Sequence, residues 1–172
     1  MRVFGFAGWS GSGKTTLVEG IIPILVGSGH RVAVIKHAHH EFDVDQPGKD
    51  SWRHRKAGAA EVLVTSGHRW ALMQELRGAP EPTLSEHLAR LSPCDLVLVE
   101  GFKREPMPKL EVHRRATGKP VLFEGDGNIV AIATDQPLAS SLPQFALEDH
   151  AGIVDFILRH TGLARPAHPS QT

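Results

Sequence analysis

The sequence has a single cysteine and no tyrosine among its 172 residues. One cysteine, Cys94, cannot form a disulfide within the chain, which excludes a disulfide-stabilised extracellular scaffold and favours a reducing compartment. Long apolar runs are also missing, because stretches such as Ile21 to Val26 are far shorter than the ~18–20 residues that span a bilayer. We therefore expect a cytoplasmic protein that has no membrane partner.

An excess of charge of either sign is absent as well. The 19 Lys and Arg residues balance 19 Asp and Glu residues, so the formal net charge is zero. Proteins that bind nucleic acid are usually basic, and nucleic acid is therefore not expected as a partner. At roughly 150 residues per domain the length indicates one domain, which we expect over residues 1–163, with a disordered tail at 164–172.

Apolar patterning predicts strands that alternate with helices. The predicted strands cover residues 2–7, 31–37, 61–65, 69–76, 95–99, 109–114, 120–123 and 129–133, and the predicted helices cover 13–26, 51–58, 83–91 and 148–160. The alternation indicates an α/β sandwich of three layers with a mixed, mostly parallel sheet. The segment 61–76, with Ser66-Gly67 at its turn, predicts a hairpin that does not fit a parallel sheet and would form an added β arm.

A glycine-rich segment follows the first predicted strand. Residues 8–15 (GWSGSGKT) fit the phosphate-binding pattern G-x-x-x-x-G-K-[ST] in its required strand–turn–helix context. Glycines let successive backbone N–H groups approach one phosphate, and the helix that follows adds free N–H groups. The predicted nucleotide-binding residues are Gly8, Ser10, Gly11, Ser12, Gly13, Lys14, Thr15 and Thr16. The fold class is therefore a P-loop NTPase sandwich.

Individual side chains of this loop have distinct expected roles. Lys14 should reach the β- and γ-phosphates, and the Thr15 hydroxyl should ligate Mg²⁺. Such a site also needs an acid at the end of a neighbouring strand. Glu100, which ends the apolar run 96–99, is the candidate second metal residue, with a solvated strand-end charge as the alternative.

An unusual segment, KHAHHEFDVDQPGKDS, begins at Lys36 after the second predicted strand, whose carboxyl end should lie beside the loop. Its histidines lack a familiar zinc spacing, so a loop that contacts Mg²⁺, phosphates or a second substrate is favoured over a chelating site or a plain solvated loop. Asp43 and Asp45 are candidate metal residues. The candidate contacts to a second substrate or to phosphate are His37, His39, His40, Lys49 and Arg53.

Taken together, several segments resemble one known family, MobB, the molybdopterin-guanine dinucleotide biosynthesis adaptor proteins. The resemblance joins GWSGSGKTT, KHAHHEFDVDQPGKDS, RKAGAAE (55–61), RWALM (69–73), DLVLVEGFK (95–103), PKLEVHR (108–114) and ATD (133–135), and it covers about residues 2–160. It implies a GTP- and Mg²⁺-binding adaptor with weak hydrolysis at most. The partner it implies is MobA, the nucleotidyltransferase that joins GMP to molybdopterin. It also implies homodimers formed through the β arm, and it makes molybdopterin a further candidate partner.

Guanine recognition has one candidate residue. A carboxylate after a late strand can accept hydrogen bonds from two guanine N–H groups that adenine lacks, and Asp135 stands in such a position. Ala133 replaces the lysine of the usual N/T-K-x-D form, so the preference for guanine is implied mainly by the resemblance. The alternative role of Asp135 is that of a turn residue before Pro137.

Two other functions fit the P-loop. A small kinase would transfer a γ-phosphoryl group to a nucleoside or another small acceptor, and a metallochaperone GTPase would use the histidine segment to hold Zn²⁺ or Ni²⁺. The sequence indicates no catalytic base, and Arg53, Arg55 or an arginine of a second subunit are the candidates for a catalytic arginine. The absence of an evident acceptor-binding set favours the adaptor.

Overall fold

The computed structural model describes residues 1–38 and 42–164, which form two compact units. The first unit contains residues 1–37 and the described residues from 87 onward, and the second contains residues 38–86. The single nucleotide-binding domain expected over 1–163 stays a prediction. All but the first residue of the expected tail lies outside the described residues.

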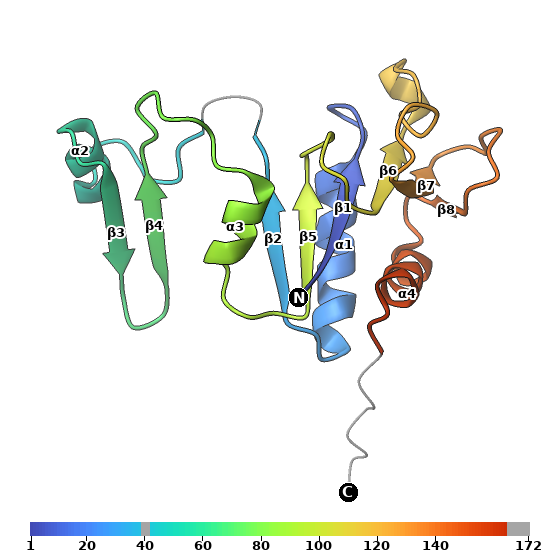
Figure 1. The fold of residues 1–172 in the computed structure, drawn as a ribbon, viewed down its shortest axis with the longest axis horizontal. Helices are drawn as coiled ribbons and strands as arrows, with labels where there is room; N and C mark the ends of the chain where they lie inside the picture. The colour runs from blue at the N-terminus through green and yellow to red at the C-terminus, as the bar shows by residue number, and fades with distance from the viewer. Residues whose placement is uncertain (39–41, 165–172) are drawn as a thin grey trace, which may run out of the picture. The chain divides into compact units, whose positions relative to one another are not determined.

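The first unit is built on a six-stranded sheet in which every pairing is parallel (Figure 1). Its strands, in spatial order, are β2 (Val32–Lys36), β5 (Leu96–Glu100), β1 (Arg2–Ala7), β6 (Lys109–His113), β7 (Ile129–Thr134) and β8 (Gln144–Ala146). Because all six strands run in the same direction, their carboxyl ends meet at one edge of the sheet. Ligands of open α/β sheets bind at this edge.

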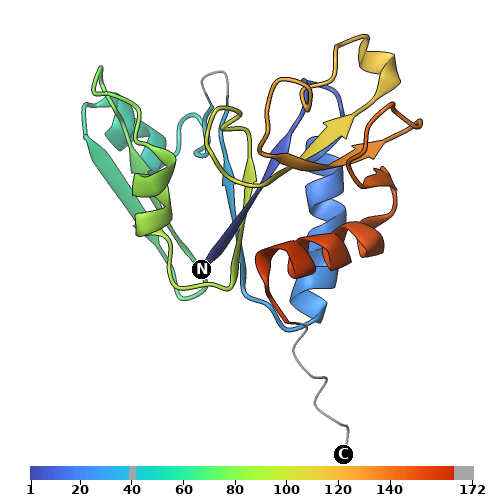
Figure 2. The same ribbon diagram turned by 45° about the vertical axis from the view of Figure 1, so that its right-hand side comes forward.

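One face of the sheet carries the hydrophobic core. Phe4 and Phe6 of β1 are fully buried there against α1 (Lys14–Gly27) and α4 (His150–Thr161). The two helices pack on each other and on the same side of the sheet, as Figures 1 and 2 show. The carboxyl-terminal half of β1 therefore packs against both α1 and α4. This packing holds in place the loop that joins β1 to α1.

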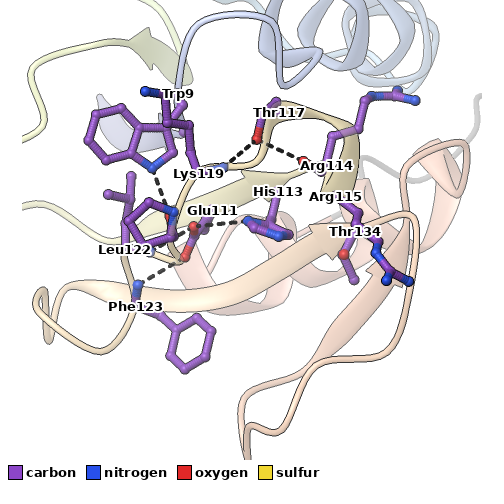
Figure 3. Close-up of polar contacts among 12 residues, drawn as sticks. Trp9, Glu111, His113, Arg114, Arg115, Thr117, Lys119, Leu122, Phe123 and Thr134 are labelled. Carbon is purple, nitrogen blue, oxygen red and sulfur yellow. Dashed lines mark hydrogen bonds and ion pairs between the residues drawn. The ribbon is translucent and has the colours of Figure 1, made fainter.

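The opposite face of β6 carries buried charges. Lys109 and Glu111 are both 0% exposed. Lys109 donates to Asp126 Oδ2 at 2.6 Å and to the Lys103 carbonyl at 2.8 Å. Glu111 accepts the backbone N–H groups of Leu122 and Phe123 at 2.8 and 2.9 Å (Figure 3). These bonds fix two loops, one after β5 and one after β6, next to the carboxyl edge.

The second unit contains the helix α2 (Asp50–Lys56) and the antiparallel hairpin of β3 (Glu61–Thr65) and β4 (Trp70–Gln74). The hairpin forms a separate two-stranded sheet, which is the added arm that the sequence predicted. Arg55 of α2 donates to the carboxylates of Asp43, Asp45 and Glu75 at 2.6, 2.8 and 2.9 Å. These contacts connect the segment before α2 to the end of β4.

The last helix before β5 is α3 (Leu84–Arg90), which contains the boundary between the units. Thr83 and Glu86 have the spacing of a capping box, and its contacts are present: Glu86 accepts the Thr83 N–H at 2.7 Å, and the Thr83 hydroxyl accepts the Glu86 N–H at 3.3 Å. In the described part of the chain, no helix combines the length and the apolar character that crossing a bilayer requires.

One predicted strand is absent from the structure, and one strand was not predicted. Residues 120–123 form no strand and lead into a turn at 123–125, because the N–H groups of Leu122 and Phe123 bind the Glu111 carboxylate instead of a neighbouring strand. The three-residue strand β8 was missed. A short 3-10 helix, η1 (Arg115–Thr117), follows β6.

Candidate nucleotide-binding site

The P-loop lies between β1 and α1 at the carboxyl edge of the sheet, and its shape depends on glycine. Gly8, Gly11 and Gly13 have φ angles of 150°, 79° and 97°, which side-chain-bearing residues rarely adopt. A Cβ on Gly8 would lie only 2.5 Å from the Val112 carbonyl oxygen of β6. Gly13 is the N-cap of α1, so the free N–H groups of the helix begin directly after the loop.

Lys14 lies across its own loop. Its ammonium group donates to the carbonyls of Gly8 and Trp9 at 3.0 and 2.9 Å. Partial burial lowers the pKa of Lys14 below its ordinary value of 10.5, Glu100 acts against this, and the charges of Lys103 and Lys36 lower it further. An anion bound in the loop would relieve the repulsion among Lys14, Lys36 and Lys103. Binding a phosphate is the role expected of Lys14 in this motif.

The proposed metal residues of the first unit are in direct contact. The Thr15 hydroxyl donates to Glu100 Oε1 at 2.9 Å, although the two residues are 85 positions apart. Lys36, the last residue of β2, donates to the Thr15 hydroxyl at 3.3 Å, and its ammonium lies 3.6 Å from Glu100 Oε2. A hydroxyl and a carboxylate at this spacing are oxygen ligands that Mg²⁺ accepts, directly or through water.

The other loop side chains differ in burial. Ser12 is 1% exposed, and its hydroxyl oxygen has no hydrogen-bond partner among the described residues. Ser10 and Thr16 are exposed. A buried hydroxyl without a partner is unfavourable, so Ser12 fits a ligand with acceptor oxygens. The Ser12 hydroxyl, the helix N-terminus, Lys14 and the Thr15–Glu100 pair together fit the phosphates and metal of a nucleoside triphosphate.

Trp9 connects the loop to neighbouring segments. Its indole N–H donates to the Pro120 carbonyl at 2.7 Å (Figure 3). The ammonium groups of Lys103 and Lys119 lie 4.6 and 5.8 Å from the centre of its ring. Pro120 precedes the turn that Glu111 anchors, so the buried carboxylate of β6 fixes the segment that contacts Trp9.

Asp135 follows β7 at the same edge. Its Oδ1 accepts the backbone N–H of Arg115 at 3.0 Å, which joins the ends of β6 and β7. The structure thus gives Asp135 a turn-stabilising contact, and its role toward guanine stays a prediction.

His37 lies at this edge against the segment that follows β5. Its backbone N–H donates to the Glu100 carbonyl at 2.8 Å, and its ring centre lies 4.9 Å from that of Phe102. Phe102 has a φ of 46°, an uncommon value for a bulky residue. His37 is therefore close to the acid of the proposed metal site.

The other predicted site residues belong to the second unit or are not described. Asp43 and Asp45 bind Arg55, Lys49 is the N-cap of α2, and Arg53 lies 3.9 Å from Asp50. Their roles toward metal and substrate stay predictions. His39 and His40 lie outside the described residues. Within 1–38 and 42–164, no three or more His, Cys, Asp or Glu side chains are grouped as a metal site requires.

Sequence reasoning missed three basic residues of the site. Lys36 and Arg114 stand at the carboxyl ends of β2 and β6, and Lys103 stands in the loop after β5. A Cβ on Gly13 would lie 3.5 Å from the Arg114 guanidinium, so this side chain is close to the loop. Lys36 and Arg114 could have been identified from the sequence, because the residue at or just after the end of a parallel strand lies at the edge of the sheet where ligands bind.

A family model described as "MobB: Molybdopterin guanine dinucleotide synthesis protein B" matches residues 3–135. The chain is 45% identical over 158 residues to the molybdopterin-guanine dinucleotide biosynthesis adapter protein of Haemophilus influenzae, covering 90% of this chain and 86% of that protein. It is 43% identical over 159 residues to the protein of the same name from Escherichia coli, covering 91% of both.

Solved structures agree with these matches. The crystal structure of a molybdopterin-guanine biosynthesis protein B has a TM-score of 0.73 and 28% identity, covering 92% of this chain and 99% of that one. A MobB homologue from Bacillus stearothermophilus has a TM-score of 0.71 and 27% identity, covering 95% and 100%. With the family model matching most of the sequence and relatives above 40% identity, the chain belongs to the MobB family.

Proposed function

We propose that this chain is a GTP- and Mg²⁺-binding adaptor that assists a MobA-type nucleotidyltransferase in attaching GMP to molybdopterin. The adaptor role in molybdopterin-guanine dinucleotide biosynthesis follows from membership of the family. The single observation that carries nucleotide binding is the contact of Thr15 with Glu100 beside the Lys14 ammonium. In a P-loop protein these are the groups that hold Mg²⁺ and the terminal phosphates.

The bound nucleotide would neutralise charges that now repel one another. Lys14, Lys36 and Lys103 all contribute positive potential at the loop, and each of the first two is close to Glu100. Glu100 and Thr15 would hold Mg²⁺, which would supply Lewis-acid chemistry at the phosphates. The residues of this chain would orient the triphosphate, and weak hydrolysis at most is what membership of the family implies.

A homodimer is part of the proposal. Leu63 of β3 and Leu72 of β4 stand opposite each other in the hairpin and are 58% and 50% exposed, and the neighbouring Trp70 is 65% exposed. A contiguous apolar surface of this kind is typical of an interface. Light scattering should give twice the chain mass of 18.7 kDa, and a monomer at micromolar concentration would remove this part of the proposal.

The decisive test is calorimetric binding of GTP and of ATP, each with Mg²⁺. We expect GTP to bind at least about tenfold more tightly than ATP, a difference of about 1.4 kcal/mol. Lys14→Ala should weaken GTP binding by at least about 100-fold, because it removes charge-assisted hydrogen bonds to phosphate. The matched control is Lys56→Ala in the second unit, which should bind GTP as the wild type does.

The adaptor role has a separate readout. Formation of the guanine dinucleotide by a MobA-type enzyme should rise when this chain is added, and Lys14→Ala should reduce the gain. Preferential ATP binding with rapid phosphorylation of a small acceptor, at about 1–100 turnovers per second, would instead identify the kinase that the P-loop also allows.

A further inference from the structure

The ammonium group of Lys36 contacts the two side chains that are proposed to hold Mg²⁺. It donates to the Thr15 hydroxyl at 3.3 Å and lies 3.6 Å from Glu100 Oε2. The Thr15 hydroxyl in turn donates to Glu100 Oε1 at 2.9 Å. The three groups therefore meet at one point, where a positive charge lies against the oxygens that a divalent cation would use.

The fold holds the oxygens of this group more firmly than the ammonium. Glu100 is the last residue of β5, an inner strand that pairs with β1 and β2, and its side chain is 10% exposed. Thr15 belongs to the first turn of α1, directly after the loop. The Lys36 side chain, in contrast, is 55% exposed. The ammonium can therefore leave the two oxygens without unpacking the core.

The register of the sheet keeps the backbone of Lys36 beside Glu100. The two residues are direct partners in the parallel pairing of β2 with β5. The pairing continues past them, because the His37 N–H donates to the Glu100 carbonyl at 2.8 Å. The charge of Lys36 also contributes to the lowered pKa of Lys14, which shows that it acts on the P-loop. Lys36 is therefore fixed at a position from which its charge acts on both Glu100 and the loop.

A second cation at this point would be repelled by the ammonium. Unit charges about 4 Å apart interact about four times more strongly near a protein surface than in water, and a divalent ion doubles the effect. Mg²⁺ usually binds through one or two carboxylates and completes its shell with water and substrate phosphates. Glu100 and Thr15 supply one carboxylate and one hydroxyl. Mg²⁺ alone therefore has few ligands with which to displace Lys36.

We propose that Lys36 competes with Mg²⁺ for Glu100 and Thr15 and thereby makes metal binding depend on the nucleotide. Without a nucleotide, the ammonium neutralises Glu100 and keeps the divalent cation out. With a triphosphate in the loop, Lys36 gains phosphate oxygens as another partner, and Glu100 and Thr15 share the metal with those oxygens. The inference rests on the proposed function in one respect, that Thr15 and Glu100 hold Mg²⁺ beside a triphosphate.

The test uses Mn²⁺ as a paramagnetic substitute for Mg²⁺ and measures its binding to the full chain by electron paramagnetic resonance, without nucleotide. Lys36→Met removes the charge and keeps a long side chain. Its affinity for Mn²⁺ should be at least about tenfold higher than that of the wild type, because the competing cation is gone. Lys36→Arg keeps the charge and should bind Mn²⁺ as weakly as the wild type. An unchanged affinity in Lys36→Met would overturn the proposal.

Two controls show whether the gained metal lies at Glu100. Adding Glu100→Gln to Lys36→Met should abolish the gain, because it removes the carboxylate. Lys103→Met removes an equal charge that also acts on Lys14, but the Lys103 ammonium lies 4.6 Å from the centre of the Trp9 ring. This variant should raise the affinity for Mn²⁺ by less than about threefold. A gain equal to that of Lys36→Met, or a gain that survives Glu100→Gln, would overturn the proposal.

The nucleotide provides a second readout. A non-hydrolysable guanosine triphosphate analogue should increase the Mn²⁺ affinity of the wild type by a factor at least about ten times larger than in Lys36→Met. The reason is that only in the wild type does the analogue also draw an ammonium away from Glu100. The affinity of the analogue itself for Mn²⁺ is common to both proteins and cancels. Equal increases in the two proteins would contradict the competition.

Failure of the inference and failure of the proposed function give different results. If the analogue-loaded wild type binds Mn²⁺ through Glu100 while nucleotide-free Lys36→Met gains no affinity, the inference alone is overturned. If the chain binds no analogue but Lys36→Met gains an affinity for Mn²⁺ that Glu100→Gln removes, the competition is supported and the proposed function fails.

Discussion

Arg55 in the second unit is surrounded by three carboxylates, whereas Arg114 in the first unit lies beside the positive end of a helix. The side chain of Arg55 is 12% exposed and donates to Asp43, Asp45 and Glu75. No carboxylate within 1–38 or 42–164 forms an ion pair with the Arg114 guanidinium, which lies 3.5 Å from where a Cβ on Gly13 would be. Arg55 therefore uses its charge within the fold, whereas the charge of Arg114 has no carboxylate partner among the described residues.

The same difference extends to the regions around the two residues. The P-loop is shaped by backbone conformation and by the close packing of Gly8 on Val112, and most of its cations have no carboxylate partner. The second unit has few buried side chains and relies on the ionic contacts of Arg55. Substitution of the loop glycines should therefore lower the stability of the first unit, and removal of charge should lower the stability of the second unit.

The largest effect is expected for Gly8→Ala. The added Cβ would meet the Val112 carbonyl at 2.5 Å, and the φ of 150° is unsuited to alanine. We expect a loss of about 3 kcal/mol in the free energy of unfolding, measured with urea. Gly11→Ala is the control, because its Cβ would meet nothing within 4 Å at a φ of 79°. It should lose about 1–2 kcal/mol, and equal losses would contradict the packing argument.

Charge removal in the second unit should give the next largest effect. Arg55→Met leaves three carboxylates close together without their cation, so the urea midpoint should fall. Asp45→Asn should lower it more than Asp43→Asn, because the Asp45 side chain is 4% exposed and that of Asp43 is 51% exposed. The reverse order would mean that the buried contact does not stabilise this unit.

The smallest effect concerns Glu111 and pH. Burial raises the pKa of Glu111 above its ordinary value of 4.5, against the effect of the Leu122 and Phe123 N–H groups. The folded state therefore favours the protonated acid, and the stability that Glu111 contributes is fullest below pH 4.5 and is lost as pH rises through the raised pKa. The free energy of unfolding of the wild type minus that of Glu111→Gln should fall across this range. A difference that is constant or rises contradicts the assignment.

The sequence predicted the parts of the molecule that depend on local pattern. The strand at residues 2–7, the hairpin and the α3 capping box all have a periodic or turn signature, and all three are present. The contact of Thr15 with Glu100 was also within reach, because a P-loop and a neighbouring acidic strand end belong to one edge.

The parts that could not be predicted depend on contacts between distant residues. The apolar run 120–123 has the composition of a strand, but its N–H groups bind Glu111, and nothing in the local pattern indicates a buried carboxylate nearby. The strand β8, at three residues, is too short to show alternation. Arg55 was a candidate catalytic arginine, but its side chain binds carboxylates that come from two other segments.

Trp9 also makes the P-loop visible to spectroscopy. The chain has three tryptophans and no tyrosine, so its near-ultraviolet emission comes from indole alone. Trp52 and Trp70 belong to the second unit, and Trp9 is therefore the one tryptophan in the first. A Trp52→Phe/Trp70→Phe protein would report the surroundings of the phosphate loop with its native sequence, without an added label.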